Sequence, residues 1–113
     1  MSLYILNSLI TPVDYSLSKA IVLIQKITKE QAADILKNTP FISAVGHEST
    51  AQLLTSLLGV IVPMNRIAIS MKNGDMAIHF VLRERLPEGK VLSLDELKNL
   101  QYQFYLSQVI AVF

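Results

Sequence analysis

Apolar and polar residues alternate along the chain in blocks that predict strands interleaved with helices. Leu3–Leu6 is a short apolar run and predicts a strand. Ala20–Ile24 is rich in branched aliphatic residues, which is typical of a strand buried on both faces. Thr28 and Gln31 have the spacing of a capping box, so we expect a helix that starts there and ends near Asn38.

A second helix is predicted to start with Ser49 as its N-cap, in the segment Gly46–Thr50. Ser49 is a good N-cap residue and Gly59 a good C-cap residue, and they bracket a stretch of helical length. The apolar positions between them mark one helical face: Leu53, Leu54, Leu57 and Leu58. Glu48 is the only formal charge between residues 37 and 66, so we expect this helix to be the most buried.

The chain from Arg66 onward shows two alternating runs joined by Asn73-Gly74, the preferred residue pair for a type I′ hairpin turn. With Lys72 opposite Asp75, one face of this hairpin receives Ile67, Ile69, Met71, Met76, Ile78, Phe80 and Leu82. The other face receives Arg66, Ala68, Ser70, Ala77, His79, Val81, Arg83 and Arg85. The hairpin therefore predicts that all three arginines share a face with His79.

The last part of the chain predicts one more helix and one more strand. Ser93 and Glu96 form a capping box for a short helix that we expect to end at Leu100. The apolar segment Tyr102–Phe113 predicts a final strand. Strands interleaved with helices are typical of an α/β domain. We therefore expect one domain over residues 1–113, with helices covering the faces of a mixed sheet.

The composition indicates a globular chain with part of its surface covered. Hydrophobic residues make up 51% of the chain and charged residues 17%, against about 25% charged residues in a typical soluble domain. This balance excludes a disordered chain, which needs the opposite bias. It also indicates that a second copy covers some of the surface, so we expect a homodimer.

Charge and residue content exclude several classes of protein. The net charge is +1, so no overall field recruits double-stranded nucleic acid or an anionic membrane. The absence of cysteine excludes disulfides and thiolate chemistry, and two histidines without a carboxylate cluster give no ligand set for a metal. The uncharged segment Gln52–Asn65 is too short to span a membrane. We expect a cytoplasmic protein without metal or cofactor.

The arginines allow two interpretations. Guanidinium groups bind phosphate oxygens in a bidentate manner, so Arg66, Arg83 and Arg85 on one face are typical of an anion site. The same pattern fits a solvated outer face, with Glu84 and Glu88 as ion-pair partners. The residues alone leave both interpretations open.

The two histidines lie in different settings. His47 directly follows Gly46 and precedes a predicted helix, where free N–H groups and the helix dipole favour a bound anion. An imidazole there can exchange a proton with a phosphate ester, or it can help to cap the helix. His79 lies in the middle of a predicted strand, and we expect it to be packed or solvated rather than catalytic.

Three separated motifs resemble the viral ring nucleases, small type III anti-CRISPR proteins of archaeal viruses and bacterial phages. The motifs are Gly46–Thr50, Asn65-Arg66 and Arg85–Leu92, and with Leu6–Ser8 the resemblance covers nearly the whole chain. It implies a homodimer that binds cyclic tetra-adenylate, the second messenger of type III CRISPR defence, in a pocket across the two-fold axis. It further implies that the ring is cut without a metal.

The resemblance also implies a role for each matching residue. His47 corresponds to the general acid and Arg85 to a phosphate-stabilising arginine. Glu88 corresponds to a catalytic-site glutamate, which either orients His47 or acts as a base. The residues with an implied ligand contact are Arg66, Gly46, Ser49, Asn7 and Arg83.

The implied reaction uses the nucleophile that RNA itself carries. A 2′-hydroxyl attacks the neighbouring phosphorus, and the ring opens to linear di-adenylates that end in a 2′,3′-cyclic phosphate. The protein must align the attack, stabilise the phosphorane and protonate the leaving 5′-oxygen. Two other hypotheses remain: a binder of cyclic nucleotides or nucleic acid that does not cut, and a structural interaction protein of a virus or prophage.

Overall fold

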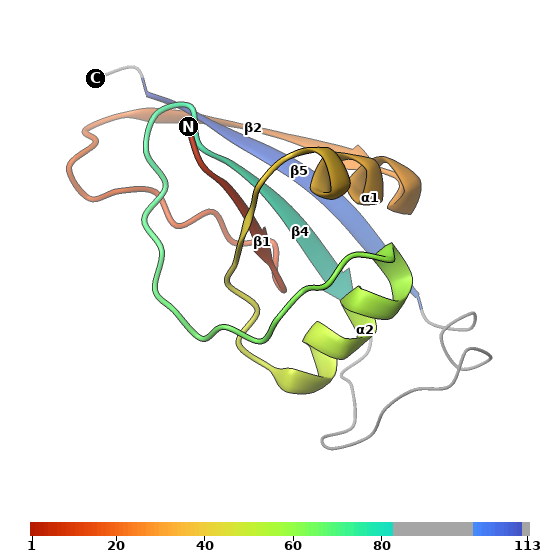
Figure 1. Ribbon diagram of the computed structural model, residues 1–113. Coiled ribbons are helices and arrows are strands. Elements are labelled where there is room, and N and C mark those ends of the chain that lie inside the picture. The colour runs from red at the N-terminus through yellow and green to blue at the C-terminus, as the bar shows by residue number, and fades with distance from the viewer. Residues whose placement is uncertain (83–100, 112–113) are drawn as a thin grey trace.

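The computed structural model describes residues 1–82 and 101–111. Within these ranges the strands are β1 (Leu3–Leu6), β2 (Ala20–Ile27), β3 (Ile42–Ser43), β4 (Met76–Leu82) and β5 (Tyr102–Ala111), and the helices are α1 (Lys29–Asn38) and α2 (Glu48–Leu58). The strands form one sheet in the order β2-β5-β4-β1-β3 (Figure 1). β1 is parallel to β3 and β4, whereas β5 is antiparallel to β4 and β2. The protein is a mixed α/β domain, as its sequence predicts.

α1 begins at the predicted capping box. The Thr28 hydroxyl accepts a hydrogen bond from the Gln31 N–H at 3.0 Å, and the Gln31 side chain accepts one from the Thr28 N–H at 2.9 Å. These reciprocal bonds satisfy backbone donors that have no acceptor inside the helix. The helix ends at Asn38, and Thr39 is its extended C-cap. The predicted bounds of this helix are confirmed.

α2 starts before the residue that we expected. His47, not Ser49, is the N-cap residue, and its carbonyl accepts the first intrahelical bond from the Ala51 N–H at 3.0 Å. Ser49 lies inside the first turn, after Glu48, whose negative charge is favourable at the positive end of the helix dipole. Gly59 is the C-cap, as predicted, with a φ of 67° that glycine adopts without strain.

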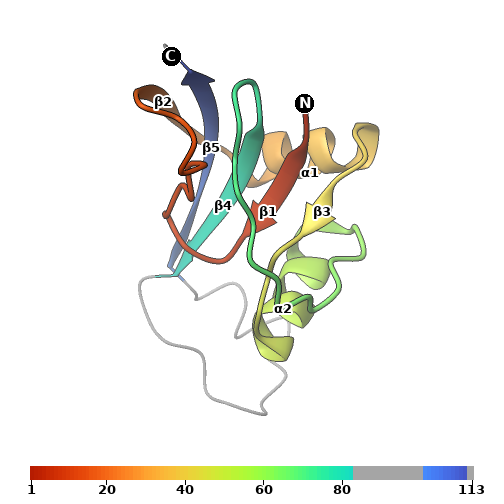
Figure 2. The ribbon, with the colours of Figure 1, turned by 90° about the vertical axis from the view of Figure 1, so that its left-hand side faces the viewer.

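Both described helices lie on the same face of the sheet, behind it in Figure 2. α2 buries more of its residues than α1, which confirms it as the more buried of the two. The buried apolar side chains between these helices and the strands include Leu3, Ile5, Ile27, Ala32, Leu36, Ala51, Leu53, Leu54, Leu58, Ile78, Phe80 and Phe104. Burial of this apolar surface is the main stabilising contribution to the fold.

The opposite face is covered by the segments 7–19 and 67–71, which lie in front of the sheet in Figure 2. A second apolar cluster packs there: Leu6, Met71, Ala77 and Val109, with Val13, Leu17 and Ile69 partly buried against it. In the described part of the chain, segments without helices thus cover this face. The expectation of helices on both faces is not met there.

The predicted hairpin does not form. β4 has β1 on one side and β5 on the other, so no edge is open for residues 66–72 to pair with. That segment instead crosses the sheet, and Met71 makes an isolated bridge with Val13. The alternation predicted within β4 itself is confirmed, because Ile78 and Phe80 join the helix-side core while Ala77 joins the opposite cluster.

A turn forms at the predicted place but is of a different type. The Asp75 N–H donates to the Lys72 carbonyl at 3.0 Å. Gly74 has a φ of 88°, whereas Asn73 has no positive φ, which fits a type II turn rather than the type I′ turn of a tight hairpin. The buried Asp75 carboxylate accepts from the Lys72 and Ser2 N–H groups, both at 2.9 Å. The turn is therefore attached to the start of β1 through Asp75 and to β5 through backbone hydrogen bonds with Val109, and residues 66–72 are not its hairpin partner.

β2 confirms the strand predicted over Ala20–Ile24 but not its burial. Among the described strands it lies at the edge of the sheet, and its one partner there is β5. Ile21, Leu23 and Ile24 are 55%, 53% and 47% exposed. Branched aliphatic residues indicate a strand through local preference, whereas burial depends on where the strand lies in the sheet. The expectation of a strand buried on both faces is wrong.

The last expectations lie partly outside the described residues. The strand predicted over Tyr102–Phe113 is confirmed as far as Ala111. The helix predicted over residues 93–100 lies outside the described ranges. In the part of the chain that the structure describes, no helix is long and apolar enough to cross a membrane.

Candidate functional site

Several candidate residues lie where parallel strands end. β1 leads directly into Asn7, and β3 leads through Ala44 and Val45 to Gly46 and His47. β1, β3 and β4 run in one direction, so their carboxyl ends lie along the same edge of the sheet (Figure 2). Ligands of open α/β sheets bind outside that edge. The fold thus places Asn7 and His47 where a ligand site is expected.

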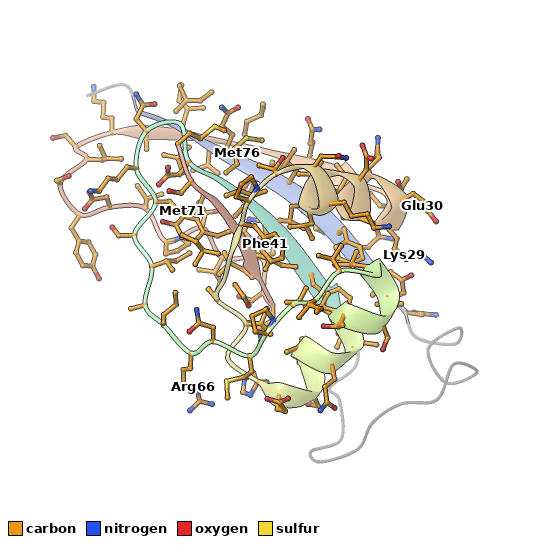
Figure 3. The ribbon with its side chains drawn as sticks, in the orientation of Figure 1. Lys29, Glu30, Phe41, Arg66, Met71 and Met76 are labelled. Atoms are coloured by element: carbon orange, nitrogen blue, oxygen red, sulfur yellow. The ribbon has the colours of Figure 1, made fainter. Side chains whose placement is uncertain are left out.

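Arg66 lies against this loop although it is distant in the sequence. Its guanidinium donates two hydrogen bonds to the Gly46 carbonyl, from Nε at 3.3 Å and from Nη2 at 3.1 Å. The residue remains exposed, and Figure 3 shows it at the surface. A guanidinium carries five N–H donors, so it can bind an anion while it is held by Gly46. The structure therefore brings Arg66 to the residue directly before His47.

Residues 63–66 form a strap along the loop that follows β3. The Asn65 N–H donates to the Val45 carbonyl and the Asn65 side-chain amide to the Ser43 carbonyl, both at 2.7 Å. The Ser43 hydroxyl donates to the Pro63 carbonyl at 2.7 Å. These bonds satisfy buried polar groups, and they fix the loop that carries the candidate residues.

The hydrogen bonds of Ser43 and the anchoring role of Asn65 were not predicted from the sequence. Ser43 is a polar residue inside an apolar stretch, whereas Asn65 was marked only as part of the Asn65-Arg66 motif. Their hydrogen bond joins positions 22 residues apart. Such a pairing depends on the tertiary fold, so the pattern along the chain does not reveal it.

His47 stands at the start of α2 with its side chain exposed. It is an N-cap through its backbone alone, because its imidazole makes no capping hydrogen bond. The alternative that His47 helps to cap the helix is therefore met by its backbone, while its imidazole takes no part in the cap. The N–H groups of residues 48–50 have no acceptor within the helix, since Ala51 donates the first intrahelical bond. An anion bound to these N–H groups would lie close to the imidazole.

Asn7, Gly46 and Ser49 are half-buried. Gly46 has no positive φ, and a Cβ added to it would meet Arg66 Nε at 3.6 Å, an ordinary contact distance. Within the described residues, neither backbone conformation nor packing requires glycine at this position. A requirement for Gly46 would therefore come from a ligand that approaches the backbone closely.

His79 is 0% exposed and lies on the sheet face opposite the helices. Its Nδ1 is 2.8 Å from the Ser8 carbonyl oxygen and its Nε2 is 2.6 Å from the Ser107 hydroxyl. Burial lowers the pKa of His79 because desolvation penalises the charged ring, and the hydrogen bond to Ser8 opposes this effect in part. The expectation of a packed histidine is confirmed.

The predicted common face of arginines and His79 is absent from the described residues. Arg66 is exposed beside the start of α2, whereas His79 is buried in the sheet. Arg83, Arg85 and Glu88 lie outside the described residues. Across residues 1–82 and 101–111, no three His, Asp or Glu side chains are placed to hold a metal ion.

Similar proteins come from viruses and from a bacterium. Uncharacterized protein 26 of Sulfolobus islandicus filamentous virus is 41% identical over 109 residues, which is 96% of this chain and 92% of that protein. Uncharacterized protein ORF117 of Acidianus two-tailed virus is 40% identical, with 91% and 89% covered. Uncharacterized protein YddF of Bacillus subtilis is 39% identical, with 73% and 78% covered.

A solved structure shares the fold. B116 of Sulfolobus turreted icosahedral virus matches with a TM-score of 0.80 and 27% identity, over 96% of this chain and 99% of that one. The sequence model described as STIV B116-like matches residues 3–104, which is most of the chain. This protein therefore belongs to the STIV B116-like family.

Proposed function

We propose that the protein is a homodimeric, metal-independent ring nuclease. It cleaves cyclic tetra-adenylate to linear di-adenylates that end in a 2′,3′-cyclic phosphate, and it thereby disables type III CRISPR defence. The observation that supports this most is the exposed imidazole of His47 at the start of α2, which makes no capping hydrogen bond and follows the Gly46 carbonyl that Arg66 binds. A proton donor and a cation meet there at an anion-binding helix terminus.

The attacked phosphate is held by two sets of donors. The first set is the free N–H groups of residues 48–50 in the first turn of α2. The second is the Arg66 guanidinium, which is held by its hydrogen bonds to the Gly46 carbonyl. When the 2′-hydroxyl attacks, negative charge grows on the phosphorane oxygens, and donors already in position stabilise that charge. By the resemblance to ring nucleases, Arg85 adds a second guanidinium.

His47 acts as the general acid. The 5′-oxygen leaves as the bond to phosphorus breaks, and the cationic imidazole gives it a proton. General acid catalysis of this kind is typically worth about 10²–10⁴-fold in rate. The proton of the attacking 2′-hydroxyl passes to a base. By the same resemblance, Glu88 either takes this proton or orients His47.

Two copies provide two sites for one ring. The low share of charged residues indicates a covered surface, and large apolar side chains are exposed in the segments 7–19 and 61–71: Leu9, Ile10, Tyr15, Ile61, Met64 and Ile67. Contact between copies removes such surface from water. A two-fold axis then sets two equal sites against one ring, so two cuts release two di-adenylates.

The relatives support the proposed setting. Several are encoded by viruses that infect cells, and a virus gains from removing a messenger that activates host defence. The compartment of action is then the cytoplasm of the infected cell. A similar protein in Bacillus subtilis fits a prophage origin or a host protein of related chemistry.

Product analysis tests the proposal. Purified protein is incubated with cyclic tetra-adenylate in excess EDTA, and the products are separated by chromatography. Conversion to di-adenylates with a cyclic phosphate is the expected result. Intact ligand recovered after denaturation, together with a ligand-dependent rise in melting temperature, would instead indicate a binder that does not cut. Intact ligand without a thermal shift would contradict both.

A further inference from the structure

His79 is a buried titratable residue that the proposed reaction does not use. It lies in the middle of β4, next to Leu6 of β1 in the sheet register. Both ring nitrogens have a partner, the Ser8 carbonyl and the Ser107 hydroxyl. The His79 side chain is 0% exposed, and both of its ring nitrogens have hydrogen-bond partners. This indicates a specific role for the imidazole, because an apolar side chain would fill the same space without needing hydrogen bonds.

The partners determine the protonation state of the ring. A carbonyl oxygen only accepts, so Nδ1 must carry the proton that bonds to Ser8. In a neutral ring Nε2 is then an acceptor, and the Ser107 hydroxyl donates to it. The short Nε2–Oγ distance of 2.6 Å is consistent with a well-formed bond. The Ser8 carbonyl thus sets the tautomer of His79, and the Ser107 hydroxyl donates to the nitrogen that is left without a proton.

The residue that His79 holds lies beside the candidate site. Ser8 directly follows Asn7, at the point where the chain leaves β1 and turns over the sheet. Bonds inside the β1–β4 ladder end at Leu6, whose register partner is His79 itself. The hydrogen bond from the His79 side chain to Ser8 therefore holds the segment after β1 to β4, two residues beyond the end of the strand. Without it, the backbone at Asn7 has no such anchor in the described part of the chain.

We propose that His79 is a positioning residue, whose Nδ1–H fixes the Ser8 carbonyl and thereby holds Asn7 at the ligand site. The role of Asn7 in ligand binding rests on the proposed function. The anchoring of residues 7 and 8 rests on the hydrogen bonds alone. His79 itself touches neither ligand nor reacting atoms.

Two amide substitutions test the hydrogen bonds of Nδ1 and Nε2 separately. In His79→Asn the amide nitrogen takes the place of Nδ1 and can still donate to Ser8. In His79→Gln the amide oxygen takes the place of Nε2 and can still accept from Ser107, but the donor to Ser8 is lost. Both variants remove the imidazole, so a difference between them reports the Ser8 bond and not burial in general.

The first readout is amide hydrogen exchange, which needs no ligand. We expect His79→Gln to speed exchange over residues 7–17 roughly tenfold, and His79→Asn to stay close to the wild type. The second readout is cleavage of cyclic tetra-adenylate. KM is expected to rise roughly tenfold in His79→Gln with kcat little changed, because a ligand contact is misplaced while the reacting groups remain. Equal exchange in both variants would overturn the inference.

A measurement on the unaltered protein covers the case in which the variants do not fold. The chain has two histidines, so nitrogen-15 spectra can be assigned by comparison with His47→Ala. We expect the neutral Nδ1–H tautomer for His79, and an Nε2–H tautomer would contradict the inference directly. If the wild type does not cleave the ring, the proposed function fails, but tautomer and exchange still decide the role of His79.

Discussion

The Arg66 guanidinium donates two hydrogen bonds to the carbonyl of Gly46, a residue 20 positions earlier in the chain. Gly46 directly precedes His47, the N-cap residue of α2. The contact therefore fixes a cation next to the imidazole-bearing residue before any ligand binds. Sites with donors already in place stabilise developing charge better than sites that must first reorganise.

Substitution of Arg66 should weaken ligand binding without unfolding the protein. Arg66 is exposed, so we expect Arg66→Ala to change the free energy of unfolding by no more than about 0.5 kcal/mol. Affinity for cyclic tetra-adenylate should fall at least roughly tenfold, and Arg66→Lys should restore only part of it because an ammonium lacks the planar fork. Calorimetric titration measures the affinity. Lys26→Ala, an exposed change on β2, is the matched control, and an equal loss there would contradict the assignment.

Loss of the Asn65 side chain should loosen the strap. Asn65→Ala removes the donor to the Ser43 carbonyl and leaves that acceptor unpaired. We expect the free energy of unfolding to fall by about 1–3 kcal/mol, measured by urea denaturation. Asn38→Ala removes an exposed amide that bonds to Asp34 at the end of α1 and should cost less. Equal losses in the two variants would show that Asn65 is no special anchor.

Three glycines should respond differently to alanine. Gly59 and Gly74 have positive φ values of 67° and 88°, so alanine at either position is strained by about 1–2 kcal/mol. Gly46 has no positive φ and room for a Cβ, so Gly46→Ala should keep the stability of the wild type. Thermal melting compares the three variants. A large loss of stability in Gly46→Ala alone would contradict the geometry described for this loop.

The burial of His79 predicts a pH dependence of stability. Burial lowers the pKa of His79 in the folded chain, whereas the unfolded chain takes up the proton near pH 6.5. Between these two pKa values the unfolded chain binds more protons, so the free energy of unfolding falls as the pH falls below about 6.5. Urea denaturation at several pH values should show this slope in the wild type and in His47→Ala, and a flatter one in His79→Asn. An unchanged slope in His79→Asn would assign the effect to another group.

Local signals predicted the elements that depend on local chemistry. The capping box at Thr28 and Gln31 forms as expected, and Gly59 ends α2. Pairing of distant segments was not predictable in this way. The alternation over residues 66–72 favours a strand, yet β1 and β5 already occupy both sides of β4, and that competition is decided by the whole sheet.

In the candidate site, too, the features that depend on local sequence were predicted and those that depend on distant contacts were not. His47 was predicted at the start of a helix because capping residues and a leucine face surround it, and the structure places it there. The contacts of Arg66 with Gly46 and of Asn65 with Ser43 join segments about 20 residues apart. The interpretation of Arg66 as part of a strand face failed for this reason, although its interpretation as an anion-binding residue remains a prediction.

The central claim is that His47 gives the proton that releases the 5′-oxygen. The most direct test compares cleavage and binding of cyclic tetra-adenylate by the wild type and by His47→Ala, in excess EDTA. We predict that the variant binds the ring with an affinity close to that of the wild type but cleaves it at least roughly 10²-fold more slowly. Cleavage by His47→Ala at the wild-type rate would contradict the account.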